Sequence, residues 1–167
     1  SLIILIFSGL LLLFLFIHSN APDYNFELYS DSVSAPVEVV FDDMAVPHIY
    51  ADTEVDGMYA LGYVHASERL WQMDLLRRAG AGELAELLGS DMVENDEYLR
   101  TLGMREAAVR TAAEFEAEAP KTIRSAMHAY LMGINSYIET GQRPLEYQVL
   151  GESPRPFTVR DVYASTG

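Results

Sequence analysis

The sequence contains no cysteine, and this absence excludes several kinds of chemistry at once. Without a thiol the chain can form no disulfide bond, no cysteine nucleophile and no thiolate metal site. Lysine is almost as rare, because Lys121 is the only one in 167 residues. Aspartate and glutamate total 25 against 11 lysines and arginines, which gives a formal net charge of −14. A nucleic acid is therefore excluded as a partner, since binding phosphates requires a basic surface.

Common catalytic and cofactor motifs are also missing. The chain has no G-x-S-x-G nucleophile elbow, no HExxH zinc motif, and no glycine-rich loop for phosphates or dinucleotides. Its four histidines, at positions 18, 48, 65 and 128, include no pair with the spacing of zinc ligands. We expect structural roles for them. The residue pattern by itself therefore identifies no catalytic, no substrate-binding and no metal-ligating residue.

Three groups of charged residues resemble sites at first sight, and each has a plainer interpretation. Asp42 and Asp43 are adjacent on an extended segment, so their carboxylates point to opposite sides and a turn-capping role is favoured. The acidic residues 91–97 lack the glycine and glutamate positions of an EF-hand loop, and we predict a solvated connection there. Arg77 and Arg78 have acidic residues within reach, which favours internal ion pairs over anion binding.

By composition the chain divides into three parts. Residues 1–17 carry no charge and are mostly Leu, Ile and Phe, as in the core of a signal peptide or a retained membrane anchor. Residues 18–36 are polar and rich in turn formers, so we predict a tether. Residues 37–167 form the remaining domain. Because the chain opens on serine, with no basic segment before the apolar run, we expect its N-terminus to be truncated.

The domain begins with a predicted strand pair. Residues 37–41 (VEVVF) are β-branched or aromatic, and after a short turn Pro47 begins a second extended run through residue 51. From about residue 54 the apolar residues recur at helical spacing, which predicts a first long helix. Gly80 and Gly82 are expected to close this helix.

Four more helices are expected after it, separated by polar segments. They are predicted over residues 83–88, over 105–119, from Pro120 to about residue 140 with Gly141 as its C-terminal cap, and after a loop at 142–157. Thr158 and Asp161 resemble a capping box that opens the last one, which is cut short at Gly167. We therefore expect truncation here too. The predicted fold class is α+β: a mostly helical fragment with an N-terminal strand pair.

An ordered set of short motifs, spanning residues 37–163, resembles the N-terminal part of the penicillin acylase family. The set comprises VEVVFD at 37–42, VPHI at 46–49, GYVHA at 62–66, ERLWQM at 68–73, RR at 77–78, LAELLG at 84–89, AYLMGIN at 129–135 and PRPFT at 154–158. Three positions depart from the family pattern. Ala45 replaces a turn glycine, Glu68 a more usual aspartate and Phe157 a more usual tryptophan.

The resemblance implies a function that the residues alone do not show. Members of the family are exported N-terminal-nucleophile hydrolases with a four-layer αββα fold, and each precursor cuts itself into an α chain and a larger β chain. The serine that begins β attacks an amide carbonyl, with its own α-amino group as the base. Substrates are amides with a hydrophobic acyl part, as in penicillins, cephalosporins and acyl-homoserine lactones. This chain would be most of an α chain, inactive by itself.

Further expectations follow for cofactors, partners and location. No cofactor is expected for catalysis, and a structural calcium ion is possible in the full-length protein, with ligands beyond Gly167. The expected partners are the β chain, a small amide substrate and a membrane through the N-terminal segment, in a membrane-anchored or periplasmic location. One alternative stays open at this point: a non-enzymatic, membrane-anchored module that binds a partner protein.

Overall fold

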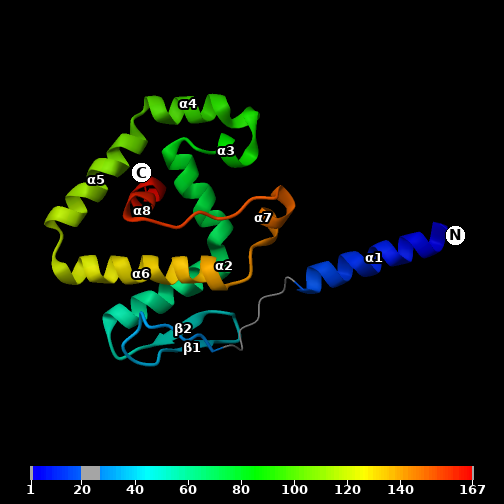
Figure 1. Ribbon diagram of the computed structural model, residues 1–167, viewed down its shortest axis with the longest axis horizontal. Helices are drawn as coiled ribbons and strands as arrows, with labels where there is room; N and C mark the ends of the chain where they lie inside the picture. The colour runs from blue at the N-terminus through cyan, green and yellow to red at the C-terminus, as the bar shows by residue number, and fades with distance from the viewer. Residues whose placement is uncertain (1, 20–26, 167) are drawn as a thin grey trace.

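A computed structural model describes residues 2–19 and 27–166, which are mostly helical (Figure 1). The elements in chain order are α1 Leu2–Ser19, β1 Glu38–Phe41, β2 Pro47–Tyr50, α2 Glu54–Ala81, α3 Ala85–Leu88, the 3₁₀ helix Ser90–Met92, α4 Val93–Thr101, α5 Met104–Glu118, α6 Lys121–Thr140, α7 Leu145–Leu150 and α8 Val159–Thr166. Helices α2, α4, α5 and α6 surround α8, and the strand pair lies beside the first half of α2 (Figure 1).

The two strands form an antiparallel hairpin, as predicted, with Pro47 at the beginning of the second strand. Its turn is capped by Asp42, whose Oδ1 accepts hydrogen bonds from the backbone N–H groups of Met44 and Val46, both at 2.9 Å. The predicted turn-capping role of this aspartate is confirmed. Ala45 adopts a φ of 58°, a left-handed conformation that residues with a Cβ rarely take.

Helix α2 is capped at both ends and bent in the middle. The Thr53 hydroxyl accepts from the N–H of Asp56 at 3.1 Å, and Gly82 ends the helix with a left-handed φ of 62°. Near the centre, the Ser67 hydroxyl donates to the carbonyl of Val64 at 2.8 Å, a bond that competes with the helical ladder. Two residues later Arg69 leaves the helical region, with φ −140° and ψ 16°. The bend allows one helix to pack against both α6 and α8.

Glycine brings α2 and α6 into backbone contact. A Cβ built on Gly62 would lie 1.9 Å from the carbonyl oxygen of Tyr130, and a Cβ on Gly133 would lie 1.9 Å from that of Tyr59. Real Cβ atoms essentially never approach another atom this closely. The crossing therefore depends on a glycine in each helix.

Gly80 makes the same kind of contact, and the prediction that it closes α2 is wrong. It lies inside the helix, where a Cβ would stand 1.7 Å from the carbonyl oxygen of Ala164 in α8. The helix continues through Gly80 because packing against α8 outweighs the low helix propensity of glycine. Gly141 also differs from a typical glycine cap, since it ends α6 in an extended conformation, with φ −82°.

The core lies mainly between α2, α5, α6 and α8, with Tyr147 of α7 reaching into it. Tyr147, Leu70 and Ile134 are among its largest side chains that are almost completely buried. The ring of Trp71 packs edge-on against that of Tyr147, with centroids 5.1 Å apart. This burial explains why residues 142–157 are not a loop throughout: α7 forms there because Tyr147 is drawn into the core.

Residues 91–97 also differ from the prediction, which was a solvated connection. They belong to the 3₁₀ helix and to α4, and Asp96 is only 5% exposed. Its carboxylate accepts from the backbone N–H groups of Leu84 at 2.9 Å and Ala85 at 2.7 Å. Unpaired N–H groups at the start of a helical turn attract a carboxylate. Asp96 supplies it here, although it lies 12 residues after Leu84 and 11 after Ala85 in the sequence.

Part of the predicted tether is attached to α2. Ser34 donates its backbone N–H and its hydroxyl to the carboxylate of Asp56, at 2.9 and 2.6 Å. These hydrogen bonds lower the pKa of Asp56. Tyr59 donates to the hydroxyl oxygen of Ser30 at 3.0 Å. Residues 30–34 therefore pack with the domain, while residues 20–26 lie outside the described residues.

The predicted anchor at residues 1–17 coincides with α1. A membrane span takes about 20 predominantly apolar residues. Of the helices in residues 2–19 and 27–166, none is long and apolar enough to cross a membrane, so a transmembrane helix finds no support. The predicted mixture of helices and a strand pair is confirmed, but four layers are not visible in these residues.

Candidate functional site

The most heavily buried charges surround Asp74, in the second half of α2. Its carboxylate has no exposed surface and binds both arginines of the Arg77–Arg78 pair, with Arg77 Nε at 2.6 Å and Arg78 Nε at 3.1 Å. Tyr147 donates its hydroxyl to the same carboxylate at 2.6 Å. The prediction of an internal ion pair is confirmed for both arginines. Tyr147 was not foreseen, because it comes from 73 residues downstream.

Arg77 extends this network to the segment before α8. Its Nη1 and Nη2 donate to the backbone carbonyls of Pro156 and Arg155, at 2.9 and 2.8 Å. Its guanidinium also lies 3.8 Å from the ring centroid of Phe157 and 3.5 Å from the carboxylate of Asp161. One buried arginine therefore holds the entry of α8 against α2.

Asn135 of α6 fixes the same segment from the other side. Its side-chain amide donates to the backbone carbonyl of Phe157 at 2.9 Å and accepts from the N–H of that residue at 2.7 Å. Asn135 closes the AYLMGIN motif, but sequence reasoning gave it no role. Its role depends on a backbone 22 residues away, which no local pattern reveals.

The pKa shifts of Asp74 and Tyr147 make both groups poor proton carriers. Burial by itself raises the pKa of Asp74, but the Tyr147 hydroxyl and the charge of Arg77 hold it below its ordinary range. Burial and the hydrogen bond to Asp74 raise the pKa of Tyr147 far above its ordinary value. The Asp74 carboxylate therefore stays ionised and the Tyr147 phenol stays protonated near neutral pH. Neither Asp74 nor Tyr147 is therefore suited to act as a general acid or base near neutral pH, and their contacts give the network a structural role.

The described histidine contacts also have a structural character. His48 Nε2 lies 3.2 Å from a carboxylate oxygen of Asp42 in the hairpin. His65 Nδ1 lies 3.1 Å from the Tyr130 hydroxyl. These partners are a carboxylate and a phenol, so neither contact pairs a histidine with a serine or threonine hydroxyl.

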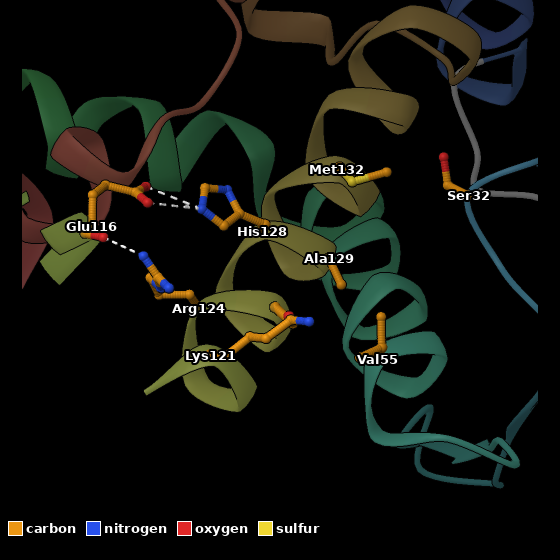
Figure 2. Close-up of a pocket in the computed structure, with 9 residues that line it drawn as sticks. Ser32, Val55, Glu116, Lys121, Arg124, His128, Ala129 and Met132 are labelled. Atoms are coloured by element: carbon orange, nitrogen blue, oxygen red, sulfur yellow. Dashed lines mark hydrogen bonds and ion pairs between the residues drawn. The ribbon is translucent and has the colours of Figure 1, made fainter. Parts of the chain in front are cut away.

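An open hollow of about 410 Å³ lies along one face of α6 (Figure 2). It is lined by residues of α6, α2, α5 and the segment before the hairpin: Lys121, Arg124, Ser125, His128, Ala129, Met132, Val55, Glu116 and Ser32. His128 Nε2 lies 3.1 Å from the Glu116 carboxylate, and Arg124 donates to the Glu116 backbone carbonyl. In Figure 2 these two side chains turn toward Glu116, whereas Lys121 extends to the other side, toward Val55. The histidine is again paired with a carboxylate and activates no hydroxyl.

Metal ligands were not predicted within this chain. Across residues 2–19 and 27–166, no group of three or more His, Asp or Glu side chains is placed to hold a metal ion. The acidic residues 91–97 include a helix cap at Asp96, which is already engaged by two backbone N–H groups.

Comparison with known proteins gives a consistent result over almost the whole domain. A family profile described as penicillin amidase matches residues 36–167. Penicillin acylase 2 proenzyme of Pseudomonas sp. (strain SE83) is 40% identical over 137 residues, which cover 81% of this chain and 17% of that protein. Penicillin G acylase of Escherichia coli is 30% identical over 146 residues, covering 82% and 17%. The acyl-homoserine lactone acylase QuiP of Pseudomonas aeruginosa is 34% identical over 113 residues, covering 68% and 13%.

The fold agrees with these matches. A thermostable penicillin G acylase from Alcaligenes faecalis superposes with a TM-score of 0.67 and 32% identity, over 78% of this chain and 69% of that chain. The chain spans 17% of the length of the first two curated relatives. The ordered motifs, the matched profile and the shared fold lead to one conclusion. This chain belongs to the penicillin amidase family and corresponds to the α-chain portion of its members.

Proposed function

We propose that this chain is the α-chain portion of a self-processing amidase, which hydrolyses a non-peptide amide bond to a hydrophobic acyl group. The substrate class is that of penicillin and cephalosporin side chains and acyl-homoserine lactones. One observation carries the proposal: the match to the penicillin amidase profile runs from residue 36 to residue 167. Matched relatives carry the names penicillin acylase and acyl-homoserine lactone acylase, which supports an amide substrate.

In this proposal the chain has a structural role, and the β chain provides the catalytic groups. The nucleophile is the N-terminal serine of a β chain, activated by its own α-amino group, and donors in β stabilise the oxyanion. The four-layer αββα fold is completed by that β chain. The hydrogen bonds and ion pairs around Asp74, which join α2 to Tyr147 and to the segment before α8, support this division. The 167-residue chain expressed alone should therefore release no acid from phenylacetyl-amides or acyl-homoserine lactones, and turnover by it would contradict the proposal.

The decisive experiment uses protein expressed from the full gene. Its mature polypeptides are separated, and the N-terminus of each is sequenced chemically. Two chains, the larger beginning with serine, are expected, together with hydrolysis of a phenylacetyl-amide or an acyl-homoserine lactone. A single unprocessed chain without amidase activity would remove the proposal and leave a protein-binding module.

The proposal includes a location outside the cytoplasm and a structural calcium ion held by other parts of the protein. Fractionation of expressing cells tests the location, because amidase activity confined to the cytoplasm would exclude it. Thermal unfolding with and without a chelator tests the ion. An unchanged melting temperature would exclude calcium.

A further inference from the structure

Lys121, the only lysine of the chain, is exposed at the edge of the hollow beside α6. Among the described residues its ammonium takes part in no hydrogen bond or ion pair. In Figure 2 it extends over the hollow toward Val55 of α2. The chain has a net charge of −14, yet none of the acidic side chains in residues 27–166 forms an ion pair with this cation. The hollow therefore has an unneutralised positive charge at one end.

The nearby charges do not cancel this one. Arg124 and His128 follow Lys121 at i+3 and i+7, so all three lie on one face of α6. The opposing charge in the lining is Glu116, whose carboxylate lies 3.1 Å from His128 on the far flank. The first turn of α6 contains no acidic residue, so the partial positive charge of the helix end adds to that of Lys121. The Lys121 side of the hollow is electropositive.

The rest of the lining is uncharged: two serines, Ser32 and Ser125, and three apolar residues. Val55 of α2 is 40% exposed and Met132 of α6 is 45% exposed, while Ala129 between them is only 4% exposed. These side chains form two walls and a floor without a charged group. A ligand that fits both parts has an anionic head for the ammonium and a compact apolar body for the walls.

We propose that this hollow binds a carboxylate with a compact apolar body. Its carboxylate pairs with Lys121, and its body packs against Val55 and Met132. Hydrolysis of an amide with a hydrophobic acyl group releases an acid of this kind. Identifying the ligand with the acid released by hydrolysis rests on the proposed function. Its carboxylate and apolar body, in contrast, are inferred from the residues that line the hollow.

Binding of 4-fluorophenylacetate to the mature protein from the full gene tests the proposal. Titration followed by ¹⁹F NMR gives affinity and stoichiometry, and a crystal soaked with the acid gives the position. The wild-type protein should hold one molecule in the hollow, in addition to any held elsewhere. Lys121→Glu should weaken that site at least tenfold, because it turns an attraction into a repulsion. The matched control is Arg110→Glu, the same charge change at an exposed position of α5 outside the hollow, and it should bind as wild type does.

Further measurements separate the possible outcomes. The neutral analogue 2-(4-fluorophenyl)ethanol should not fill the hollow, and raising the salt concentration should weaken binding of the acid. An empty hollow in the soaked crystal, or equal binding by the Lys121→Glu and Arg110→Glu variants, would overturn the inference. Amide hydrolysis is measured on the same samples. Activity without acid in the hollow overturns this inference alone, whereas acid in the hollow without activity overturns the proposed function alone.

Discussion

Replacing Gly133 by alanine tests how the two longest helices of the domain are held together. The added Cβ would stand 1.9 Å from the carbonyl oxygen of Tyr59, whereas tight contacts of real Cβ atoms begin at about 3.0 Å. Helices α2 and α6 must therefore move apart by about 1 Å or more. A flexible side chain could rotate away from such a clash, but here the obstacle is backbone.

The expected cost can be worked from this geometry. Overpacking a well-packed contact costs about 1–3 kcal/mol and occasionally more, and a backbone clash belongs at the upper end of that range. Alanine recovers about 0.8–1 kcal/mol of helix propensity relative to glycine. The free energy of unfolding should therefore fall by about 2 kcal/mol. The melting temperature should fall with it.

The assay is thermal unfolding of the mature protein, followed by circular dichroism or calorimetry. Gly57→Ala is the matched control, because its Cβ would meet only the side chain of Ala51 at 3.6 Å, an ordinary contact. This variant should be neutral or stabilised by up to about 1 kcal/mol, since only the propensity gain applies. If Gly133→Ala melts within one degree of Gly57→Ala, the helices do not cross at this glycine and the packing argument fails.

Other predictions concern the buried charges and the hairpin turn. Asp74→Asn should lower the free energy of unfolding by about 3–5 kcal/mol in urea denaturation, because it leaves two buried arginines without their carboxylate; a loss under 1 kcal/mol would contradict the network. The pKa of Asp161 lies below its ordinary value of 3.8, because contacts with Arg160, Thr158 and Arg77 outweigh the effect of burial. The contribution of ionised Asp161 to the free energy of unfolding is thus fully present above pH 3.8 and is lost as the pH falls through the lowered folded-state pKa. Asp161→Asn should therefore make the free energy of unfolding less dependent on pH in this acid range. Ala45→Gly should raise stability by about 0.5–1 kcal/mol in thermal unfolding, because it removes a left-handed alanine; unchanged or lower stability would show that the turn is not strained.

Features that depend on neighbours in the chain were predictable. The predicted helix start at Thr158 and Asp161 is confirmed, but only one half of the capping box forms. Asp161 Oδ2 accepts from both the N–H and the hydroxyl of Thr158, at 2.8 and 2.7 Å, whereas the N–H of Asp161 donates to the Thr158 backbone carbonyl at 3.0 Å. The hairpin is another case, and it forms although Ala45 stands where a glycine was expected. Both features span only a few residues, so local spacing is sufficient to identify them.

Features that depend on distant partners were not predictable. Asp96 looked like one solvated acid among several, but two N–H groups at the start of α3 draw it inside. Gly80 looked like a helix terminator, but α8 passes so close that only glycine fits there. Tyr147 looked like a loop residue, but its hydroxyl bonds to Asp74 and its ring fills the core.

The sequence by itself determined the exclusion of thiol chemistry, the helical spacing of apolar residues, and the ordered motifs that mark the penicillin amidase family. Composition and spacing are properties of the chain, and no packing is needed to read them. Only the tertiary structure decided which charges are buried together and which glycines make backbone contacts. It also decided that Lys121 lies at the edge of a hollow, with no ion-pair partner in the described part of the chain. Each of these depends on groups that folding brings together from distant parts of the chain. An ionisable side chain can stay charged in the interior only where such groups surround it.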